Sequence, residues 1–443
     1  MISAQKPQPP APETPEHHRA RLPLTPAHRG SYRLVNARLW TGVGEELIEG
    51  GELVVVNDRI EYAGAARPEA AWSDGPTIDL AGLSVLPGFI DTHVHLSMSI
   101  EAGQGAMMAQ FPSHRHFHAA QTVRKTLDAG ITTARDLAGL DAGYRYAIAD
   151  GSIVGPRLHL AVAVLSPTGG HADMHFANGL NPAEGLMDGF AGIVDTDDDM
   201  RRTVRELVRA EADVIKVCTT GGVSSPSDTP HDLGIPEHQV RIAVEETGRR
   251  QGQPVTSHAQ GADGIVEAIL GGASSIEHGY EIDEAGIALM LERGTVLVPT
   301  LSSALRVPDP KKVAPYLYEK KVRWSEIARE HVTRAIAAGV TVALGTDAGV
   351  CPHGTNLTEL GHLVDLGMTP AKALAAGTIN AARLLRLDAD LGTLEPGKLA
   401  DLVITRRNPL TEIHALADPS EILAVVQGGV PRKDLDGTLS ALG

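Results

Sequence analysis

The sequence predicts an α/β fold: a (β/α)8 TIM barrel that carries a small β-sandwich domain built from both termini. Two observations lead to this prediction. Short apolar β-type runs alternate with helical patterns through the middle of the chain, as in βα units that build a parallel sheet. Runs of β texture without intervening helices occur near both ends, which favours a separate all-β unit assembled from the two terminal regions.

The terminal regions define the predicted domain boundaries. Residues 1–29 are rich in proline and polar residues, so we expect a disordered or loosely packed tail. The next segment contains YRLVNARLW, ELVVVNDRI and TIDLAGLSVLP, and similar runs return in ADLVITRRNPL and EILAVVQGGVPR. Such runs of Val, Leu and Ile between turn-forming residues are typical of strands. We expect the β-sandwich to comprise residues 30–87 and 393–443, and the barrel to comprise residues 88–392.

The middle region contains eight β-type runs: GFIDTHVH, ITTARDL, RLHLAVAVL, DVIKVCTT, PVTSHAQ, SSIEHGY, TVLVPTL and TVALGTD. Helical patterns such as HAAQTVRKTLDAG separate most of them, and glycine closes several of these patterns, as expected at a helix C-terminus. Eight alternating units over about 260 residues match a (β/α)8 barrel. An open doubly wound sheet is the alternative. It would carry a glycine-rich phosphate-binding turn after its first strand, and GFIDTHVH has none.

The composition argues against several classes of protein. The 443 residues carry a formal net charge of −16, which disfavours a nucleic-acid partner and an anionic membrane surface. Aromatic residues make up 3%, too few for a platform that stacks single-stranded bases. We find no secretory signal, no apolar run long enough for a transmembrane helix, and only two cysteines. We therefore expect a cytoplasmic protein that acts on a small molecule, with no nucleic-acid and no membrane partner.

Metal-ligand residue types gather at the predicted carboxyl ends of the strands, where barrel active sites lie. The first strand ends in His93 and His95, which share a face because they are two positions apart, so they can chelate a metal ion. Later strands supply four more polar residues: Lys216, His258, His278 and Asp347. Each residue alone has an ordinary structural interpretation, such as a hydrogen-bonded histidine or a paired lysine. Together, at the ends of five strands, they predict a metal site.

Five motifs in this order resemble the metal-dependent amidohydrolase superfamily: PGFIDTHVH, DVIKV, TSHA, SIEHG and GTDAG. The segment TINAARLLRLDADLGTLEPGKLADLVI resembles the return of that superfamily to its β-sandwich, so the resemblance covers about residues 32–430. SPTGGHAD at residues 166–173 is similar to the branch that holds Xaa-Pro dipeptidases and imidazolonepropionase-like amidohydrolases.

The resemblance implies a binuclear metal centre. The more buried ion would have three protein ligands and the second ion two, namely His93, His95 and Asp347 for the first, and His258 and His278 for the second. Lys216, carboxylated on its amine by CO2, would bridge the two ions. Every motif position matches the pattern, so we expect two divalent ions. Zinc is the default for nitrogen and oxygen ligands, and cobalt, manganese and iron are the alternatives.

The implied reaction is hydrolysis of an amide C–N bond by a hydroxide that bridges the ions. Asp347 would accept the proton of the water and pass it to the leaving nitrogen. His171 is a candidate to bind the carbonyl oxygen as it becomes an oxyanion, or else to order its loop. Arg135 and Tyr280 are candidates to hold a substrate carboxylate or amide, although Arg135 could equally pair with Asp136.

Three functions stay open from the sequence. The first is a hydrolase of dipeptides or N-acyl amino acids, which needs a partner for a terminal carboxylate. The second acts on a neutral carbamate, thiocarbamate, arylurea or arylamide, and Met107, Met108 and Phe111 would suit its apolar pocket. The third is a non-catalytic scaffold, against which the complete ligand set argues.

We interpret KKVAPYLYEKK at residues 311–321 as a solvated helix. By analogy with the branch, we expect a homo-oligomer.

Overall fold

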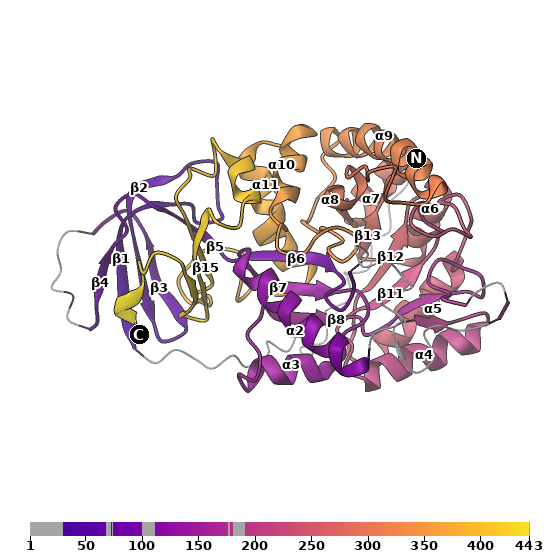
Figure 1. Cartoon of the computed structure of the whole chain (residues 1–443), viewed down its shortest axis with the longest axis horizontal. Helices are drawn as coiled ribbons and strands as arrows, with labels where there is room; N and C mark the ends of the chain where they lie inside the picture. Colours follow the sequence, from indigo (N-terminus) through magenta and orange to yellow (C-terminus); the bar gives the residue numbers. More distant parts are fainter. Residues whose placement is uncertain are drawn as a thin grey trace, which may run out of the picture.

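The computed structural model describes residues 30–67, 72, 74–99, 111–175, 178–179 and 191–442. It is an α/β structure in which a largely antiparallel sheet lies beside a region of parallel strands and helices (Figure 1). The predicted tail, as well as Met107 and Met108, lies outside the described residues.

The terminal sheet, as we name it, joins strands from both ends of the described chain. Figure 1 shows its indigo and yellow strands side by side. The order is β17-β16-β15-β5-β1-β2-β3, and β4 pairs with β1. Its strands are β1 (Ser31–Leu39), β2 (Ile48–Val56), β3 (Arg59–Gly64), β4 (Thr77–Asp79), β5 (Ser84–Pro87), β15 (Leu402–Thr405), β16 (Ile422–Gln427) and β17 (Val430–Asp434).

The central strands of the terminal sheet are buried on both faces. Successive side chains of a strand point to opposite faces. Leu402 and Ile404 of β15 belong to a core within the terminal sheet, whereas Val403 between them joins the larger core of the α/β region. Leu86 of β5 and Phe89 of the next strand also join that larger core, because β6 follows β5 after a single residue. The terminal sheet is therefore packed directly against the α/β region.

The α/β region contains two parallel sheets, with the orders β6-β7-β8 and β10-β9-β11-β12-β13-β14. Their strands are β6 (Phe89–Val94), β7 (Ile131–Asp136), β8 (Arg157–Leu160), β9 (Val164–Ser166), β10 (Ala191–Ile193), β11 (Ile215–Cys218), β12 (Val255–Ala259), β13 (Ser275–His278) and β14 (Val296–Val298). The carboxyl ends of neighbouring parallel strands therefore meet along a common edge.

Helices follow most of the parallel strands and lie along their outer side (Figure 1). They are α2 (Pro112–Asp128), α3 (Ala142–Ala149), α4 (Asp197–Arg209), α5 (Glu237–Gly248), α6 (Ala262–Gly271), α7 (Glu284–Arg293), α8 (Leu301–Ala304), α9 (Pro315–Ala337), α10 (Thr358–Asp365), α11 (Pro370–Ala375), the π-helix η2 (Ala376–Asn380), α12 (Ala381–Leu384), and the 3-10 helices η3 (Ile413–Ala417) and η4 (Ser440–Leu442).

Two of the predicted strands differ from expectation. RLHLAVAVL was predicted as one strand, but it divides into β8 and β9 because Val162 adopts a positive φ of 66° between them. TVALGTD forms no regular strand. Its segment, residues 341–348, instead makes single bridges from Leu297 to Val342 and from Val94 to Ala348. This bridging segment thus connects β14 of one parallel sheet with β6 of the other.

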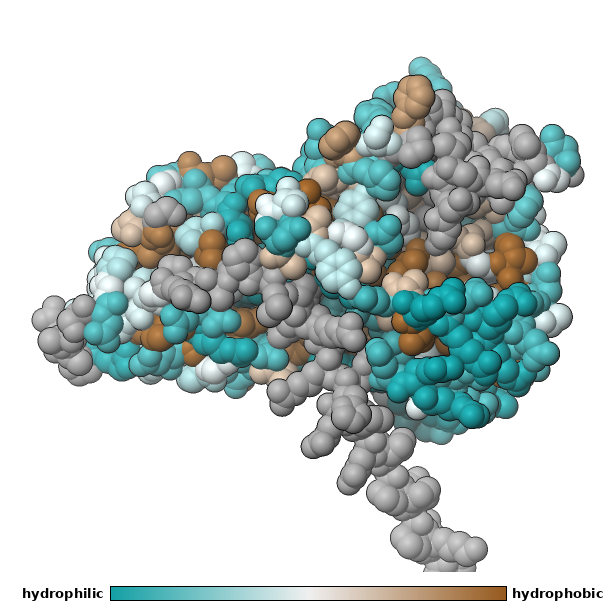
Figure 2. All heavy atoms as spheres, turned by 90° about the horizontal axis from the view of Figure 1, so that it is seen from below, coloured by the Kyte–Doolittle hydropathy of each residue, from teal (hydrophilic) through white to brown (hydrophobic). Residues whose placement is uncertain are grey.

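The surface seen from below is mostly hydrophilic, and apolar side chains appear on it in small separate patches (Figure 2). Helix α4 contributes to this character, because its first turn holds three aspartates and its exposed side carries arginines paired with them. Among the described residues, no helix combines the length and the apolar character that a membrane crossing requires.

Candidate metal centre

The tightest cluster of potential metal ligands comprises His93, His95 and Asp347. One ligand atom from each lies within 4.8 Å of the others. The Nε2 atoms of His93 and His95 lie 3.6 and 3.5 Å from the same carboxylate oxygen of Asp347. The two histidines come from β6 and the residue after its end, and Asp347 comes from the bridging segment. Two imidazole nitrogens and a carboxylate oxygen that converge in this way can hold a divalent ion.

Hydrogen bonds at Nδ1, the ring nitrogen that faces away from the cluster, orient both histidines. The Nδ1–H of His93 donates to Glu277 at 2.7 Å, and the Nδ1–H of His95 faces the carbonyl oxygen of Ala138 at 3.4 Å. A carboxylate or a carbonyl oxygen can only accept, so Nδ1 carries the proton and the lone pair of Nε2 faces the cluster. Burial lowers the pKa of His93 to about 4, so this imidazole is neutral and ready to act as a ligand at pH 7.

Arg135 lies beneath the histidines, which corrects the expectation that it holds a substrate. Its side chain is 1% exposed, and its guanidinium donates to Glu277 at 2.7 Å and to the carbonyl oxygen of Thr92. Glu277 keeps a pKa well below its usual range despite burial, because Arg135 and His93 stabilise its charge. Arg135 therefore positions Glu277, and through it His93, and it does not pair with Asp136.

Asp91 connects β6 with the bridging segment. This buried carboxylate accepts hydrogen bonds from the backbone N–H of His93, from the backbone and hydroxyl of Thr346, and from the side chain of Asn356. The backbone N–H of Asp347 in turn donates to the carbonyl oxygen of His93 at 2.8 Å. The two sides of the ligand cluster are thus held together by the backbone as well as by side chains.

His258 and His278 form a second group beside the first. The ring centroid of His278 lies 5.0 Å from that of His93 and 4.5 Å from that of His258. His258 donates from Nε2 to the carbonyl oxygen of Gly221 at 3.1 Å, and Nδ1 of His278 lies 2.8 Å from the hydroxyl of Thr300. Each ring is fixed through one nitrogen and keeps the other for a ligand.

Lys216 is the buried cation of the site. Its side chain on β11 is 3% exposed, and its Nζ atom has no hydrogen-bond partner among the described residues. Burial comes first among the causes that lower the pKa values of the four histidines, and the charge of Lys216 adds to it in each case. Its amine therefore lies within electrostatic reach of all four rings. A buried polar group without a hydrogen-bond partner is costly to the folded state.

His171 stacks on His258, with ring centroids 4.1 Å apart and planes inclined by 19°. Its Nδ1–H donates to Asp228 at 3.0 Å, so Asp228 fixes the ring. The ring also requires Gly222, because a Cβ at that position would lie 2.3 Å from Cε1 of His171. The predicted catalytic histidine is therefore adjacent to the cluster and held by its own carboxylate.

Residues 311–321, predicted as a solvated helix, are mostly exposed and become helical at Pro315, but the two lysines at the end of this segment make inward contacts near the site. Lys320 donates from Nζ to the carbonyl oxygen of Ser225 at 2.8 Å and also to that of Asp228, and thereby ties down the loop that holds His171. Lys321 donates to the carbonyl oxygen of Ser303 at 3.0 Å, and its charge acts on Asp347.

Tyr280 lies beside His278 but is enclosed. Its side chain is 3% exposed, its hydroxyl lies 3.2 Å from that of Thr300, and burial raises its pKa. It packs the wall of the site behind His278, at a ring centroid distance of 5.3 Å. Contact with a substrate stays a prediction for this residue.

Backbone strain coincides with the site. His278, Thr300 and Asp347 adopt positive φ values of 74°, 50° and 61°, which residues other than glycine rarely do. Such conformations persist where the surrounding structure enforces them, and they concentrate at functional sites.

The comparison with known families decides the assignment. The chain matches the amidohydrolase family over residues 84–431. It belongs to the amidohydrolase family. This family generally uses metal ions, and the residues described above fit such ions: neutral imidazoles, a carboxylate and a buried amine without a partner. The protein is accordingly an enzyme, a hydrolase that acts on C–N bonds.

Several amidohydrolases resemble this chain over most of its length. Ochratoxinase from Aspergillus niger is 34% identical over 362 residues, which cover 78% of this chain and 75% of that protein. An imidazolonepropionase from Rhizorhabdus wittichii is 28% identical over 407 residues, covering 83% and 92%. Among solved structures, a Xaa-Pro dipeptidase with bound methionine in its active site superposes with a TM-score of 0.82 at 29% identity and covers 91% of this chain and all of that one. These amidohydrolase neighbours have TIM-barrel type folds, consistent with the predicted fold class.

Sequence reasoning assigned no role to the residues that orient the amidohydrolase ligands. These are Asp91, Glu277, Thr300, Asp228 and the two lysines of α9. A signal exists only for Glu277, which directly precedes His278 at the end of a predicted strand. Asp91 lies within β6, the others lie in loops or on a helix, and the contacts of all of them depend on how the chain folds back on itself.

Proposed function

We propose that this enzyme holds two divalent ions and hydrolyses the amide bond of a small dipeptide or N-acyl amino acid. The observation that carries the proposal is the partnerless Nζ of Lys216, buried within electrostatic reach of four histidines. One ion would lie between His93, His95 and Asp347. The other would take His258 and His278, and a carboxylated Lys216 would contact both. Zinc fits these ligand types, and cobalt, manganese and iron fit them as well.

Carboxylation explains how an amine can serve this site. Burial lowers the pKa of Lys216 to about 8, so about a tenth of the amines are neutral at pH 7. A neutral amine can add to CO2, forming an N–C bond and releasing one proton, which turns the cation into an oxygen ligand. That change supplies a partner for the buried nitrogen and a bridge between the two groups of histidines.

Individual residues of the chain then have separate roles in the hydrolysis. Bound divalent ions would polarise the scissile carbonyl and make water a stronger nucleophile. Asp347 accepts the proton that the attacking water loses and delivers it to the leaving nitrogen, so the C–N bond breaks as an amine departs. His171 binds the carbonyl oxygen as negative charge develops on it, and Asp228 keeps the ring oriented for that contact.

Lys321 is the residue that we assign to the substrate carboxylate. Its Nζ donates to the carbonyl oxygen and to the hydroxyl of Ser303, and its charge acts to lower the pKa of Asp347, so this ammonium lies within electrostatic reach of the ligand cluster. An ammonium has three donors, which leaves one for a carboxylate on the substrate. The name of one structural neighbour, Xaa-Pro dipeptidase, accords with an amide substrate. Phe111, proposed for an apolar pocket, is 80% exposed at the start of α2.

The proposal extends to the fold. We take the two parallel sheets and the bridging segment as a closed (β/α)8 barrel of residues 88–392. Residues 30–87 and 393–443 would then form the β-sandwich.

A hydrolysis panel on metal-replete enzyme tests the function. One set of compounds would carry a free carboxylate, such as Xaa-Pro dipeptides, N-acyl amino acids and ochratoxin A. The other set would be neutral carbamates, thiocarbamates, arylureas and arylamides. We expect turnover of the first set. Turnover confined to the second set would replace the proposed substrate class by the neutral one, and turnover of neither set by a protein that purifies without metal would indicate a scaffold.

The variant Lys321→Met sharpens this test. We expect KM for carboxylate-bearing substrates to rise about tenfold while kcat changes little, because the lost contact is made equally in the ground and transition states. Lys312→Met, which removes an exposed lysine just before α9, is the matched control. An unchanged KM in Lys321→Met would refute the assignment of this residue.

A further inference from the structure

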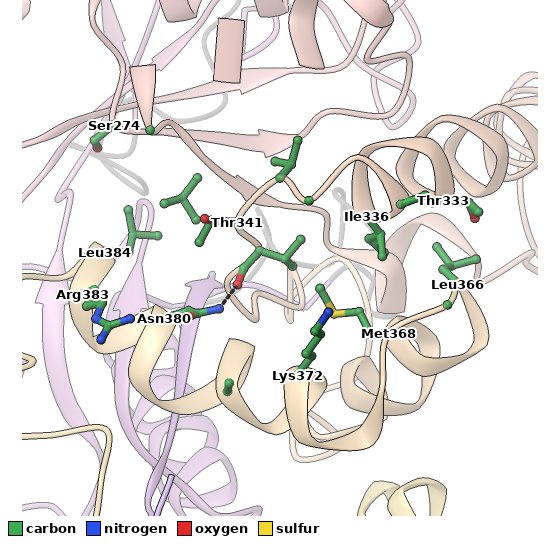
Figure 3. Close-up of a pocket in the computed structure, with 18 of the residues that line it drawn as sticks. Ser274, Thr333, Ile336, Thr341, Leu366, Met368, Lys372, Asn380, Arg383 and Leu384 are labelled. Atoms are coloured by element: carbon green, nitrogen blue, oxygen red, sulfur yellow. Dashed lines mark hydrogen bonds between the residues drawn. The ribbon is translucent and has the colours of Figure 1, made fainter. Parts of the chain in front are cut away.

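A large cavity opens at the opposite ends of the strands that carry the metal-ligand residues. It measures about 1010 Å³ and lies where β13, β14 and the bridging segment begin, against α9 and the helices α11, η2 and α12 (Figure 3). Pro254, which lines it, directly precedes β12, whereas His258 stands near the other end of that strand. Four residues of a strand span about 13 Å. The cavity is therefore separate from the metal centre.

The lining of the cavity is positively charged. Lys372, Arg383 and Arg386 are its charged lining residues, and no carboxylate lines it within the described part of the chain. Lys372 and Arg383 are exposed and form no ion pair with any residue that the structure describes, and Arg386 donates to the carbonyl oxygen of Gly252. In a chain with a net charge of −16, three such cations around one cavity form a local site for an anion.

The remaining walls are mixed in character. Ile336, Leu366, Met368 and Leu384 supply apolar surface, and Ser274, Thr341 and Asn380 supply polar groups. Figure 3 shows Lys372 beside Met368, and Arg383 on the other side, next to Leu384 and Asn380. A cation beside an apolar wall fits an anionic group attached to an apolar body. The volume is near the upper end of the usual range for ligand pockets, about 300–1,000 Å³.

One wall of the cavity is an irregular helix. The π-helix η2, Ala376–Asn380, interrupts the run from α11 to α12, and such interruptions frequently occur at functional sites. Asn380 donates from its side chain to the carbonyl oxygen of Val342 at 3.0 Å, and the N–H of Leu344 donates to Ala376 at 2.9 Å. The π-helix is thus fastened to the bridging segment, so the wall is held in place and the cavity is preformed.

We propose that this cavity is a second binding site, which takes a small organic anion with an apolar body, such as a medium-chain carboxylate. The anionic group pairs with Lys372, the apolar body lies against Ile336, Leu366 and Met368, and Arg383 on the other side of the cavity adds to the positive potential. The site is distinct from the metal centre, and its assignment does not depend on which amide the enzyme hydrolyses.

Calorimetric titration of the metal-replete enzyme with octanoate tests the proposal. We expect one saturable site in the cavity whose Kd rises at least tenfold in the double variant Lys372→Glu/Arg383→Glu. Both side chains are exposed, so the variant should fold. The double variant Lys311→Glu/Lys312→Glu is the matched control, since it reverses two exposed charges elsewhere, and its Kd should stay within twofold. Octanol, which lacks the charge, and acetate, which lacks the apolar body, should each bind at least tenfold more weakly.

Other outcomes would overturn the proposal. Octanoate that binds equally well to both double variants would occupy another place, such as the metal centre. Acetate that binds as well as octanoate would show a simple anion site without an apolar component. A failure of octanoate to bind at all, together with a changed oligomeric state in Lys372→Glu/Arg383→Glu, would mean that a second copy of the chain covers the cavity.

Discussion

The two halves of the metal centre differ in how complete they are. In the half formed by His93, His95 and Asp347, three ligand atoms already converge, and hydrogen bonds that the rings donate to Glu277 and to a backbone carbonyl orient both rings. The half formed by Lys216, His258 and His278 has oriented rings but a central amine that nothing contacts through a hydrogen bond. The fold alone builds the first half. In the proposed centre, Lys216 of the second half would have to be carboxylated before that half holds an ion.

The variant Lys216→Ala should have the largest effect, because it removes a proposed ligand of the second half and leaves the ligands of the first half in place. We expect kcat/KM to fall about a thousandfold or more, because one of two cooperating ions is lost. The first half keeps its ligands, so the variant should retain about one ion per chain, measured by elemental analysis of dialysed protein. Retention of both ions with undiminished activity would show that the amine is not part of the centre.

Asp347→Asn tests the chemical role of the complete half. We expect kcat to fall about 10²–10⁴-fold, because the amide cannot accept the proton of the attacking water. KM should change little, since that role belongs to the transition state. Steady-state kinetics of the purified variant give both values. A large rise in KM at constant kcat would instead make Asp347 a substrate-binding residue.

Glu277→Gln tests the support behind the first half. The amide leaves the N–H of His93 with a weaker partner and leaves Arg135 buried without its carboxylate. We expect the affinity for the first ion to fall about 10–100-fold. Competition with a chelator measures this affinity, and circular dichroism checks the fold. An unchanged affinity would mean that Glu277 serves only to neutralise Arg135.

The pH dependence of metal uptake should reflect the half of the centre that contains His93 and Asp347. Burial raises the pKa of Asp347 to about 7 in the metal-free protein, whereas His93 stays neutral down to about pH 4. An ion must displace the proton of Asp347 below pH 7, so affinity should fall as pH falls from 8 to 6, approaching about tenfold per unit. Calorimetry in buffers of different ionisation enthalpy counts the protons released. Uptake that is independent of pH would show that this carboxyl is already ionised.

Residue types at strand ends were enough to predict that His93, His95 and Asp347 converge, because the order of the strands places such side chains along a shared edge. Their role as metal ligands stays a prediction. How deeply each side chain is buried could not be predicted from the sequence. Arg135 occupies a strand end yet points beneath the site, because its partner Glu277 lies 142 residues away in the sequence. The inward contacts of Lys320 and Lys321 likewise depend on loops that pack against α9. The domain boundaries, the terminal tail and the homo-oligomer stay predictions.

The pairing of β5 with β15 in the terminal sheet has a consequence for biosynthesis. β5 precedes the strand of His93 by a single residue, yet β15, which pairs with β5, follows the whole α/β region in the sequence. Pairings between such distant segments form late and slowly. A nascent chain therefore leaves the N–H and C=O groups along one side of β5 unpaired until translation has passed β15.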